Sequence, residues 1–289
     1  MVPFLYVLIC LIWGSTWLVI KVGLVGVPPF LGAGLRFSLA SAVLFALIYG
    51  RGTKVKLNRD GKIAVVSCGL LSFTLSYACV YWSEQYISSG LAAILYCTMP
   101  LMTALLSRFW TKSEALSVRK MAGIVVAMAG TVVLFWPSES VARAQIVGMI
   151  VAMISVLAAA VNLVSVKKYG KDLDVFVMNG LGMSIGAVLL LAMSAAFERG
   201  AVVTWSAANV GAIVYLGVVG SVTAFLSYYS LVKVMDATRL SLITLIFPLV
   251  AVLLGWAVLH EAIPPGARAG MAAVVLGVAI AIVPAPRRG

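Results

Sequence analysis

Long, almost uncharged runs of apolar residues dominate this chain and restrict what it can fold into. Most of the runs are close to 20 residues long, which is the length of a helix that crosses about 30 Å of hydrocarbon. Of the 289 residues, 63% are hydrophobic and only 10% are charged, whereas a soluble domain has about 25% charged residues. So few charged side chains cannot cover a water-facing surface of this size, and most of the surface must therefore face lipid.

Backbone groups that face lipid find no water to bond, so only helices and closed barrels can span a bilayer. Barrel strands alternate apolar and polar residues over roughly ten positions, whereas the runs in this chain are continuously apolar. We therefore predict an all-α membrane protein with ten transmembrane helices and short connections. The expected spans are 3–22, 30–49, 62–83, 88–108, 119–136, 145–166, 175–196, 209–231, 238–258 and 267–284.

The first apolar run is expected to remain in the protein as a span. No Lys or Arg precedes it and no small-residue cleavage site follows it, in contrast to a secretory signal peptide. The four cysteines, Cys10, Cys68, Cys79 and Cys97, lie inside apolar runs and lack metal-ligand spacing. They suit small packing residues, so we expect neither a metal site nor a disulfide framework.

Lys and Arg residues are distributed unevenly between the two sides of this topology. With the N-terminus in the cytoplasm, sixteen of the 21 fall on the inner side, four fall on the outer side, and Arg36 lies within a span. Short loops rich in Lys and Arg stay in the cytoplasm, so both termini are expected there. The net charge of +12 then reflects topology and anionic lipid head groups. It requires no nucleic-acid partner, because the basic residues do not cluster with exposed aromatic residues.

The chain contains an internal repeat, because residues 69–134 match residues 217–281 at an offset of 148. An ordered set of a proline, an acid and two glycines seven positions apart seldom arises by chance in apolar sequence. The alignment of the two copies needs a one-residue gap between the proline and the acid. The matched pairs are Gly69 with Gly217, Tyr77 with Phe225, Tyr81 with Tyr229, Pro100 with Pro248, Glu114 with Glu261, Gly123 with Gly270 and Gly130 with Gly277.

Each copy of the repeat contains five predicted spans, and residues 1–140 and 141–289 are the two expected halves. Because five is odd, the second copy must enter the membrane from the opposite side. The loop after the fourth span accordingly holds four Lys and Arg residues, whereas its counterpart after the ninth span holds only Arg268. Inverted repeats of this kind are typical of secondary transporters, whose substrate site lies near the bilayer midplane between the halves.

Several short segments of the chain form an ordered set of motifs. They are Ile12-Trp13-Gly14-Ser15-Thr16-Trp17, Leu35-Arg36-Phe37, Gly90 through Pro100 to Glu114, and Ser241 through Pro248 to Glu261 and Gly277. This set resembles the EamA family of the drug/metabolite transporter superfamily, and the resemblance covers essentially the whole chain. It implies ten helices, an alternating-access mechanism and export of amino acids or related metabolites, with the aromatic amino acid exporters most similar. We expect the protein in the plasma (inner) membrane.

Aromatic residues deep in the spans indicate a central cavity lined by spans one, three, four, six, eight and nine. A Trp or Tyr buried in a span needs a partner for its polar atom or a wet cavity, although core packing remains an alternative for each of them. Asn162 in span six must also be hydrogen-bonded, either to a substrate or to a neighbouring helix. The predicted substrate-binding residues are Trp13, Trp17, Tyr77, Tyr81, Tyr96, Asn162, Phe225, Tyr229 and Thr244.

Two prolines occupy matched positions near the centres of spans four and nine. Proline lacks an N–H and clashes with the carbonyl group four residues earlier, so the carbonyl groups of Tyr96 and Thr244 should lose their usual partners. Pro100 and Pro248 are predicted hinges that leave polar backbone beside the substrate, although static kinks would give the same pattern.

Arg36 is the one basic residue clearly inside a span, about six residues from its outer end. Glu84 ends span three on the same side of the membrane. We expect a structural ion pair between the two, with an outer gate that holds a substrate carboxylate as the alternative. A snorkelling arginine would also fit this depth.

The sequence argues against several other functions. A phosphate loop is missing, and no nucleophile lies beside a base as an intramembrane enzyme would need, so neither a cofactor nor catalysis is expected. No acid lies at mid-membrane to relay protons, which favours a facilitator or a weakly coupled exporter. One chain holds both repeats, so a monomer is expected to function with a small-molecule substrate and the lipid bilayer as its only partners.

Other cargoes remain open. A lipid would require a lateral opening between helices. A nucleotide sugar would favour several basic residues in the cavity, and only Arg36 is available. A cationic drug would favour a buried carboxylate, and none is evident. A neutral or zwitterionic solute with an apolar body fits best.

Overall fold

The computed structural model describes residues 1–87, 89–111, 117–134, 143–259 and 267–282. All regular structure in these segments is helical. Six helical stretches are long and apolar enough to cross a membrane. Their bounds lie within three residues of the predicted spans. They are Val2–Leu24 (α1), Pro29–Gly50 (α2), Arg59–Ser83, Arg143–Tyr169 (α8), Val175–Phe197 (α9) and Ala207–Val234.

The remaining helices are shorter and fall where spans four, five, nine and ten were predicted. Two of these regions are broken into pieces, and the end of span five at 135–136 and the end of span ten at 283–284 lie outside the described residues. The shorter helices are α5 (Ser89–Tyr96), α6 (Met99–Leu106), η2 (Ser107–Thr111), α7 (Val118–Leu134), α12 (Ala237–Ser241), α13 (Ile243–Leu259) and α14 (Ala267–Ile282).

Polar residues fix where several long helices begin. The side chain of Asn58 accepts a hydrogen bond from the backbone N–H of Gly61, and Asp174 accepts from two backbone N–H groups at the start of α9. Ser206 and Asn209 form a reciprocal capping box at the start of the Ala207–Val234 stretch. These caps satisfy N–H groups that a helix leaves without partners in its first turn.

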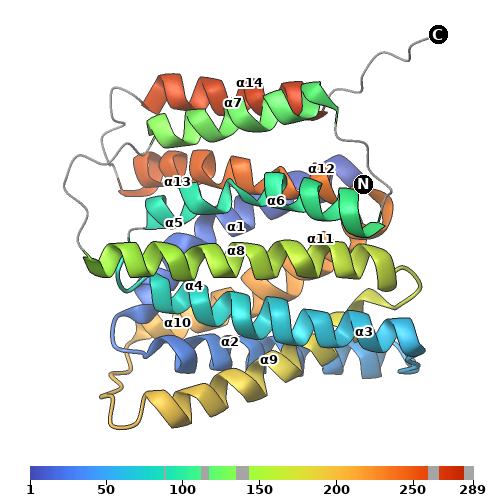
Figure 1. The fold of residues 1–289 in the computed structure, drawn as a ribbon. Coiled ribbons are helices and arrows are strands. Elements are labelled where there is room, and N and C mark those ends of the chain that lie inside the picture. The colour runs from blue at the N-terminus through green and yellow to red at the C-terminus, as the bar shows by residue number, and fades with distance from the viewer. Residues whose placement is uncertain (88, 112–116, 135–142, 260–266, 283–289) are drawn as a thin grey trace.

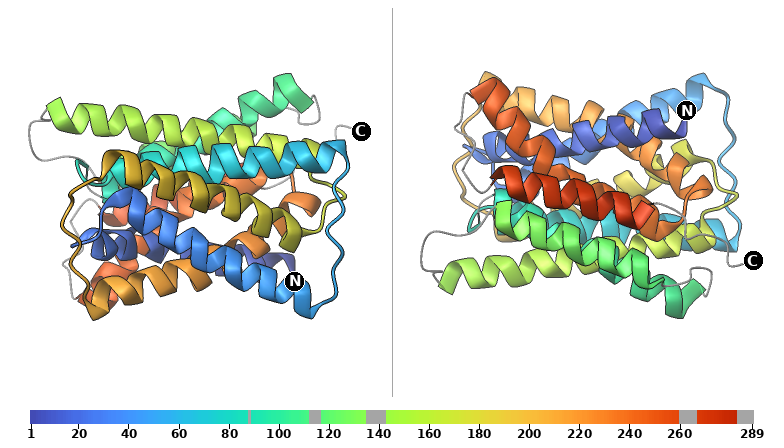
Figure 2. Two further views of the ribbon diagram at one scale, coloured as in Figure 1. Left: turned by 90° about the horizontal axis from the view of Figure 1, so that it is seen from below. Right: turned by 90° about the horizontal axis from the view of Figure 1, so that it is seen from above.

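The helices stack in layers with two helix pairs at opposite ends of the bundle (Figure 1). Helices α7 and α14 form one end, and α2 and α9 form the other. The other helices lie between these pairs, and Figure 2 shows the two helices of each pair lying side by side.

Glycines allow α7 and α14 to approach closely. A Cβ atom added to Gly123 would lie 2.6 Å from the carbonyl oxygen of Gly277, and one added to Gly130 would lie 2.8 Å from that of Gly270. Small residues at such crossings let the backbones of membrane helices touch. Gly123 and Gly130 match Gly270 and Gly277 in the sequence repeat, so each glycine packs on the counterpart of the other.

Two of the spanning stretches contain a π-helical segment in place of regular α-helix. In the Arg59–Ser83 stretch, η1 (Cys68–Ser76) separates α3 (Arg59–Ser67) from α4 (Tyr77–Ser83). In the Ala207–Val234 stretch, η3 (Val218–Thr223) separates α10 (Ala207–Gly217) from α11 (Ala224–Val234). The two segments occupy matched positions of the repeat, and neither was predicted from the sequence. Short π-helical segments inside α-helices are rare and frequently lie at functional sites.

The two prolines act differently on their helices. Near Pro100 the helix is interrupted, because α5 ends at Tyr96 and α6 begins at Met99. Pro248 lies inside α13, and the break in that region falls earlier, between Ser241 and Ile243. Both prolines are buried. The thiol of Cys97 lies 3.6 Å from the carbonyl oxygen of Thr244, one of the two groups expected to lose its helical partner.

Two lysines bind the C-terminal ends of neighbouring helices in the same manner. Nζ of Lys21 donates to the carbonyl oxygens of Glu84 and Ile87 at 2.8 and 3.0 Å. Nζ of Lys167 donates to those of Val232 and Met235, both at 2.7 Å. The two acceptors of Lys167 lie 148 positions after the two acceptors of Lys21, and 148 is the offset of the sequence repeat. A cation at this place satisfies carbonyl groups that a helix leaves unpaired at its end.

Candidate functional site

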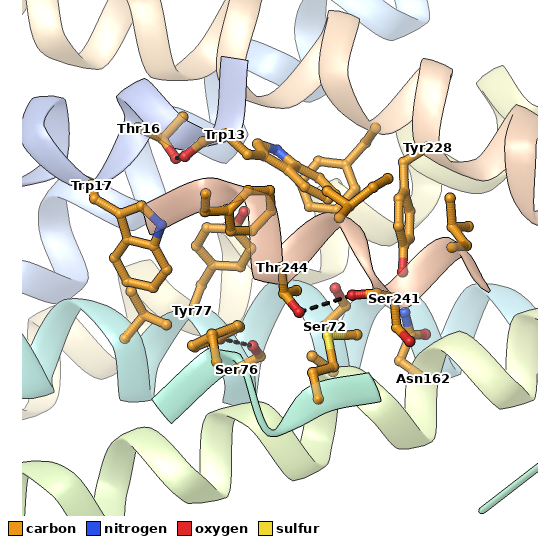
Figure 3. A pocket seen from close by; sticks show the side chains of 18 of the residues that line it. Trp13, Thr16, Trp17, Ser72, Ser76, Tyr77, Asn162, Tyr228, Ser241 and Thr244 are labelled. Atoms are coloured by element: carbon orange, nitrogen blue, oxygen red, sulfur yellow. Dashed lines mark hydrogen bonds between the residues drawn. The ribbon is translucent and has the colours of Figure 1, made fainter. Parts of the chain in front are cut away.

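A cavity of about 100 Å³ lies at the centre of the bundle (Figure 3). By the same measure one water molecule needs about 10–15 Å³, so the space admits several waters or a small solute. All six spans predicted to surround a cavity contribute to its lining, and α2 adds Arg36. The lining residues are Trp13, Thr16, Trp17, Ile20, Arg36, Ser72, Ser76, Tyr77, Val80, Tyr96, Met99, Ala159, Asn162, Phe225, Tyr228, Tyr229, Leu240, Ser241, Ile243, Thr244 and Phe247.

Aromatic rings from several helices form most of the cavity wall. Trp13 and Trp17 are one turn apart on α1, so they share a face. The ring of Trp13 lies 5.0 Å from those of Phe225 and Tyr228, and the ring of Trp17 lies 5.3 Å from that of Tyr96. These distances suit the edge-to-face and tilted contacts that aromatic pairs prefer. The wall is therefore apolar, and its shape is fixed by ring packing.

The structure brings together eight of the nine residues predicted to bind substrate. The exception is Tyr81, which is buried outside the cavity and receives a 3.5 Å hydrogen bond from Nη1 of Arg36. The predicted hinges, Pro100 and Pro248, do not line the cavity, but the residues before them, Met99 and Phe247, do. The eight lining residues are Trp13, Trp17, Tyr77, Tyr96, Asn162, Phe225, Tyr229 and Thr244.

Asn162 lines the cavity and also joins three helices. Its Nδ2 donates to the hydroxyl of Tyr229 at 2.8 Å, and its Oδ1 accepts from the hydroxyl of Ser67 at 3.1 Å. Of the two roles expected for this amide, the bridge between helices is therefore present. The bridge holds α8 against α3 and α11, and it fixes the orientation of the Tyr229 ring.

Arg36 is 1% exposed and contacts residues of the other half of the chain. Nε donates to the hydroxyl of Ser221 at 2.8 Å, and Nη2 donates to the carbonyl oxygen of Gly220 at 3.1 Å. The indole of Trp13 donates to the same carbonyl at 3.2 Å. Gly220 lies in the π-helical segment η3, so this carbonyl oxygen joins α1 and α2 to η3.

The expected ion pair between Arg36 and Glu84 is not formed, so that prediction is wrong. Both carboxylate oxygens of Glu84 are buried, and neither has a hydrogen-bond partner in the described part of the chain. Arg36 instead turns toward η3, where the hydroxyl of Ser221 and the carbonyl oxygen of Gly220 accept its N–H groups. Glu84 lies just beyond the end of α4. Burial raises its pKa to about 8, against the opposing attraction of Lys21 and Arg36.

The hydroxyl groups of the cavity were mostly missed at the sequence level. Ser76, Tyr96 and Ser155 form a buried cluster in which all three hydroxyls are hydrogen-bonded to one another. Ser72, Ser241 and Thr16 also line the cavity (Figure 3). The hydroxyl of a serine in a span usually bonds a carbonyl group of its own helix, so the sequence does not show whether the side chain faces a cavity. Tyr228 was also missed, because only its neighbour Tyr229 matches an aromatic residue, Tyr81, in the first copy of the repeat.

The arrangement suits reversible binding rather than catalysis. No group of three His, Cys, Asp or Glu residues that could hold a metal occurs among the described residues. Arg36 is the only charged side chain that lines the cavity in the part of the chain described. Apolar rings, several hydroxyl groups and one cation can bind a small solute without a covalent step.

The sequence of the chain matches the model of the EamA-like transporter family twice, over residues 1–136 and 146–283. Together the two matches cover nearly the whole chain. The chain belongs to the EamA-like transporter family. The family establishes the protein as a membrane transporter.

Family members of similar length support this assignment. The chain is 26% identical to the uncharacterized transporter YoaV of Bacillus subtilis over 256 residues, which cover 88% of this chain and 87% of YoaV. It is 32% identical to the uncharacterized inner membrane transporter YedA of Escherichia coli K12 over 251 residues, which cover 85% of this chain and 78% of YedA. A crystal structure with a TM-score of 0.81 and 22% identity covers 97% of this chain and 96% of its own, so the fold is shared.

Proposed function

We propose that this EamA-like transporter exports small metabolites, above all amino acids with aromatic side chains, by alternating access around the central cavity. One observation carries the proposal: rings and polar groups from both family-matched segments line a single cavity between them. A solute held there would contact both halves at once. A rocking movement of one half against the other would then expose it to each side of the membrane in turn.

The proposed architecture is ten transmembrane helices in two inverted five-helix repeats, residues 1–140 and 141–289. The reciprocal glycine contacts of α7 and α14 support it, because residues related by a two-fold axis contact one another's counterparts. The matched π-helical segments and the matched lysine bonds at helix ends support it as well. The helix pairs α7–α14 and α2–α9 would then lie on the pseudo-twofold axis.

Both termini are proposed to lie in the cytoplasm, with the protein in the plasma (inner) membrane. The surplus of Lys and Arg on one side supports this orientation, and the relative YedA is named as an inner membrane transporter. Accessibility labelling of single cysteines should place the connection at 51–58 and the connection at 170–174 on the same, cytoplasmic side. Labelling on opposite sides would exclude the inverted arrangement.

The cavity lining favours an amino acid over the alternative cargoes. Its rings suit an apolar body, and its one cation would leave a nucleotide sugar with too few phosphate contacts. A cationic drug finds no carboxylate among the described lining residues. A lipid would need a lateral opening, and nothing in the lining favours one.

Counterflow in proteoliposomes tests the proposal. Purified protein is reconstituted, loaded with one unlabelled amino acid, and assayed for uptake of the same labelled amino acid. We expect exchange of aromatic amino acids, a strong loss of rate in Trp17→Ala, and a normal rate in Trp205→Ala, since Trp205 is 58% exposed and outside the cavity. The proposal is wrong if the wild-type protein exchanges no amino acid.

The same vesicles test energy coupling. We propose an uncoupled or weakly coupled exporter that runs on the gradient of its substrate. An imposed pH difference should then fail to drive uptake against that gradient. Accumulation above the outside concentration would refute the uncoupled mechanism.

A further inference from the structure

Arg36 is a buried cation that no acidic side chain of the described residues pairs with. It is 1% exposed, and its four hydrogen bonds go to three hydroxyl groups and one backbone carbonyl group. Glu84 attracts it only through space, since the carboxylate oxygens of Glu84 accept no hydrogen bond. A charge inside a membrane protein normally faces an opposite charge or a functional pathway. The cavity therefore contains a positive charge without a fixed counter-ion.

The guanidinium group is held firmly on one side. Nε donates to the hydroxyl of Ser221 at 2.8 Å, and Nη2 donates to the carbonyl oxygen of Gly220 at 3.1 Å. Both acceptors belong to η3. Its Cζ atom lies 4.7 Å from the ring centre of Tyr77, a distance typical of cation–π contact. The plane of the group is thus fixed before any ligand arrives.

The other side of the guanidinium group is held weakly. The bonds from Nη2 to the hydroxyl of Tyr77 and from Nη1 to that of Tyr81 are 3.4 and 3.5 Å long, at or beyond the upper end of ordinary hydrogen bonds. Two tyrosine hydroxyls also cannot replace a carboxylate, which carries the opposite charge and can accept two parallel N–H bonds from one guanidinium group. These N–H groups can therefore exchange their hydroxyl partners for a better acceptor at small cost.

We propose that Arg36 binds a carboxylate group of the cargo, and that the protein therefore carries small monocarboxylates whose apolar body packs against the rings of Trp17 and Tyr96. The proposal rests on the transport function proposed above and specifies its substrate class. Arginine is suited to this role because its planar N–H groups can meet both oxygens of one carboxylate. Arg36, Trp17 and Tyr96 all line this one cavity.

The second half of the chain lacks an equivalent charge. Gly217 and Gly69 are matched in the repeat, and a Cβ atom added to them would meet Leu39 and Ile185, respectively. Leu39 therefore corresponds to Ile185, and three residues earlier Arg36 corresponds to Gly182. A Cβ atom added to Gly182 would lie 3.0 Å from the ring of Phe73, so an aromatic ring takes up the room beside this glycine. One cation, placed off the centre of the cavity, would give a monocarboxylate a single orientation. A cargo with several negative charges would find no second site of this kind.

Competition in the counterflow assay tests this on the unmodified protein. Exchange of labelled L-phenylalanine is measured against unlabelled 3-phenylpropionate, which keeps the carboxylate, and against L-phenylalaninamide and phenethylamine, which lack it. Because a bond to a charged group contributes about 1.5–3 kcal/mol, the compounds without a carboxylate should compete about 10- to 100-fold less well. Equal competition by L-phenylalanine and its amide would overturn the proposal while leaving amino acid transport intact.

The outcomes separate the two proposals. If L-phenylalanine, L-tyrosine and L-tryptophan and all other amino acids fail to exchange, the proposed transport function is wrong and this assignment fails with it. If amino acids exchange and the carboxylate makes no difference, only the role of Arg36 is wrong. If another amino acid gives the stronger signal, the same comparison is made with that acid and its amide.

Variants assign the effect to Arg36. In Arg36→Gln the preference for acid over amide should disappear, and in Arg36→Lys part of it should remain. Ser221→Ala is the matched control, because it removes the partner of Nε while keeping the cation, and Ser221 does not line the cavity. Ser221→Ala should keep the preference for acid over amide, whatever its rate of exchange. A purely structural role for Arg36 would lower the rate equally for every competitor, and an unchanged ratio of acid to amide in Arg36→Gln would refute the assignment.

Discussion

The close contact of α7 and α14 gives the sharpest prediction for stability. In Gly123→Ala the new Cβ atom would lie 2.6 Å from both the carbonyl oxygen of Gly277 and the backbone nitrogen of Ala281. Ordinary van der Waals contact begins near 3.4 Å, so the two helices must separate by about 0.8 Å. Backbone atoms cannot turn aside as a side chain can. Overpacking of this kind costs about 1–3 kcal/mol, and here the upper part of that range is expected.

Replacing glycine by alanine also favours the helix by about 1 kcal/mol, which would mask part of the loss. Gly211→Ala in α10 is the matched control, because nothing lies within 4 Å of the added Cβ atom. Both substitutions share the gain in helix propensity, so the difference between them isolates the packing cost. That difference should be about 1–3 kcal/mol in the free energy of unfolding.

Heating in detergent followed by gel filtration measures the effect. Gly123→Ala should lose its monodisperse peak at a temperature several degrees below that of Gly211→Ala. Gly130→Ala should behave like Gly123→Ala, since its Cβ atom would lie 2.8 Å from the carbonyl oxygen of Gly270. Equal melting of all three variants would refute the argument that these glycines are required for the α7–α14 contact.

Three further predictions concern single polar groups. The pKa of Glu84 is raised in the folded protein, so the folded protein binds the carboxyl proton more tightly than the unfolded chain does. Stability should therefore fall as the pH rises from about 5 to 8. Melting curves of Glu84→Gln should not show this fall. Lys167→Met removes two bonds from an ammonium group to carbonyl oxygens and should cost about 2–3 kcal/mol, seen as earlier loss of the gel-filtration peak. Asp174→Ala removes the N-cap of α9 and should lower stability by about 1 kcal/mol in the same assay. If Lys167→Met or Asp174→Ala melts like the wild type, the hydrogen bonds removed by that substitution do not stabilise the fold.

Most helix positions could be predicted because the signal that fixes them is local. A run of apolar residues long enough to cross the bilayer must be helical wherever it occurs, and the span predicted at 175–196 is observed as Val175–Phe197. Breaks within helices could not be placed in this way. The span predicted at 88–108 is divided at Tyr96, before Pro100, whereas Pro248 leaves α13 unbroken. The same residue type at matched positions thus has two effects, which depend on what packs around each helix.

The lining of the cavity was partly predictable for a similar reason. Large aromatic residues deep in apolar spans are few, and spacing by four residues places them on one face, so Trp13 and Trp17 could be identified together. Tyr81 satisfies the same criterion yet packs outside the cavity. Tyr77, one turn earlier on α4, does line the cavity, whereas the hydroxyl of Tyr81 accepts a bond from Arg36, a contact that the sequence does not reveal.

The sequence by itself determined that the chain crosses a membrane as helices, that it holds two related halves, and which side chains are costly to bury. Only the tertiary structure decided which polar groups meet. Arg36 binds Ser221, 185 positions away, and the carboxylate of Glu84 has no hydrogen-bond partner among the described residues, although Glu84 was the more obvious choice by charge and depth. Hydrophobicity acts on each segment separately, whereas a hydrogen bond requires two groups within about 3 Å of each other, and that distance is set by the packing of the whole bundle.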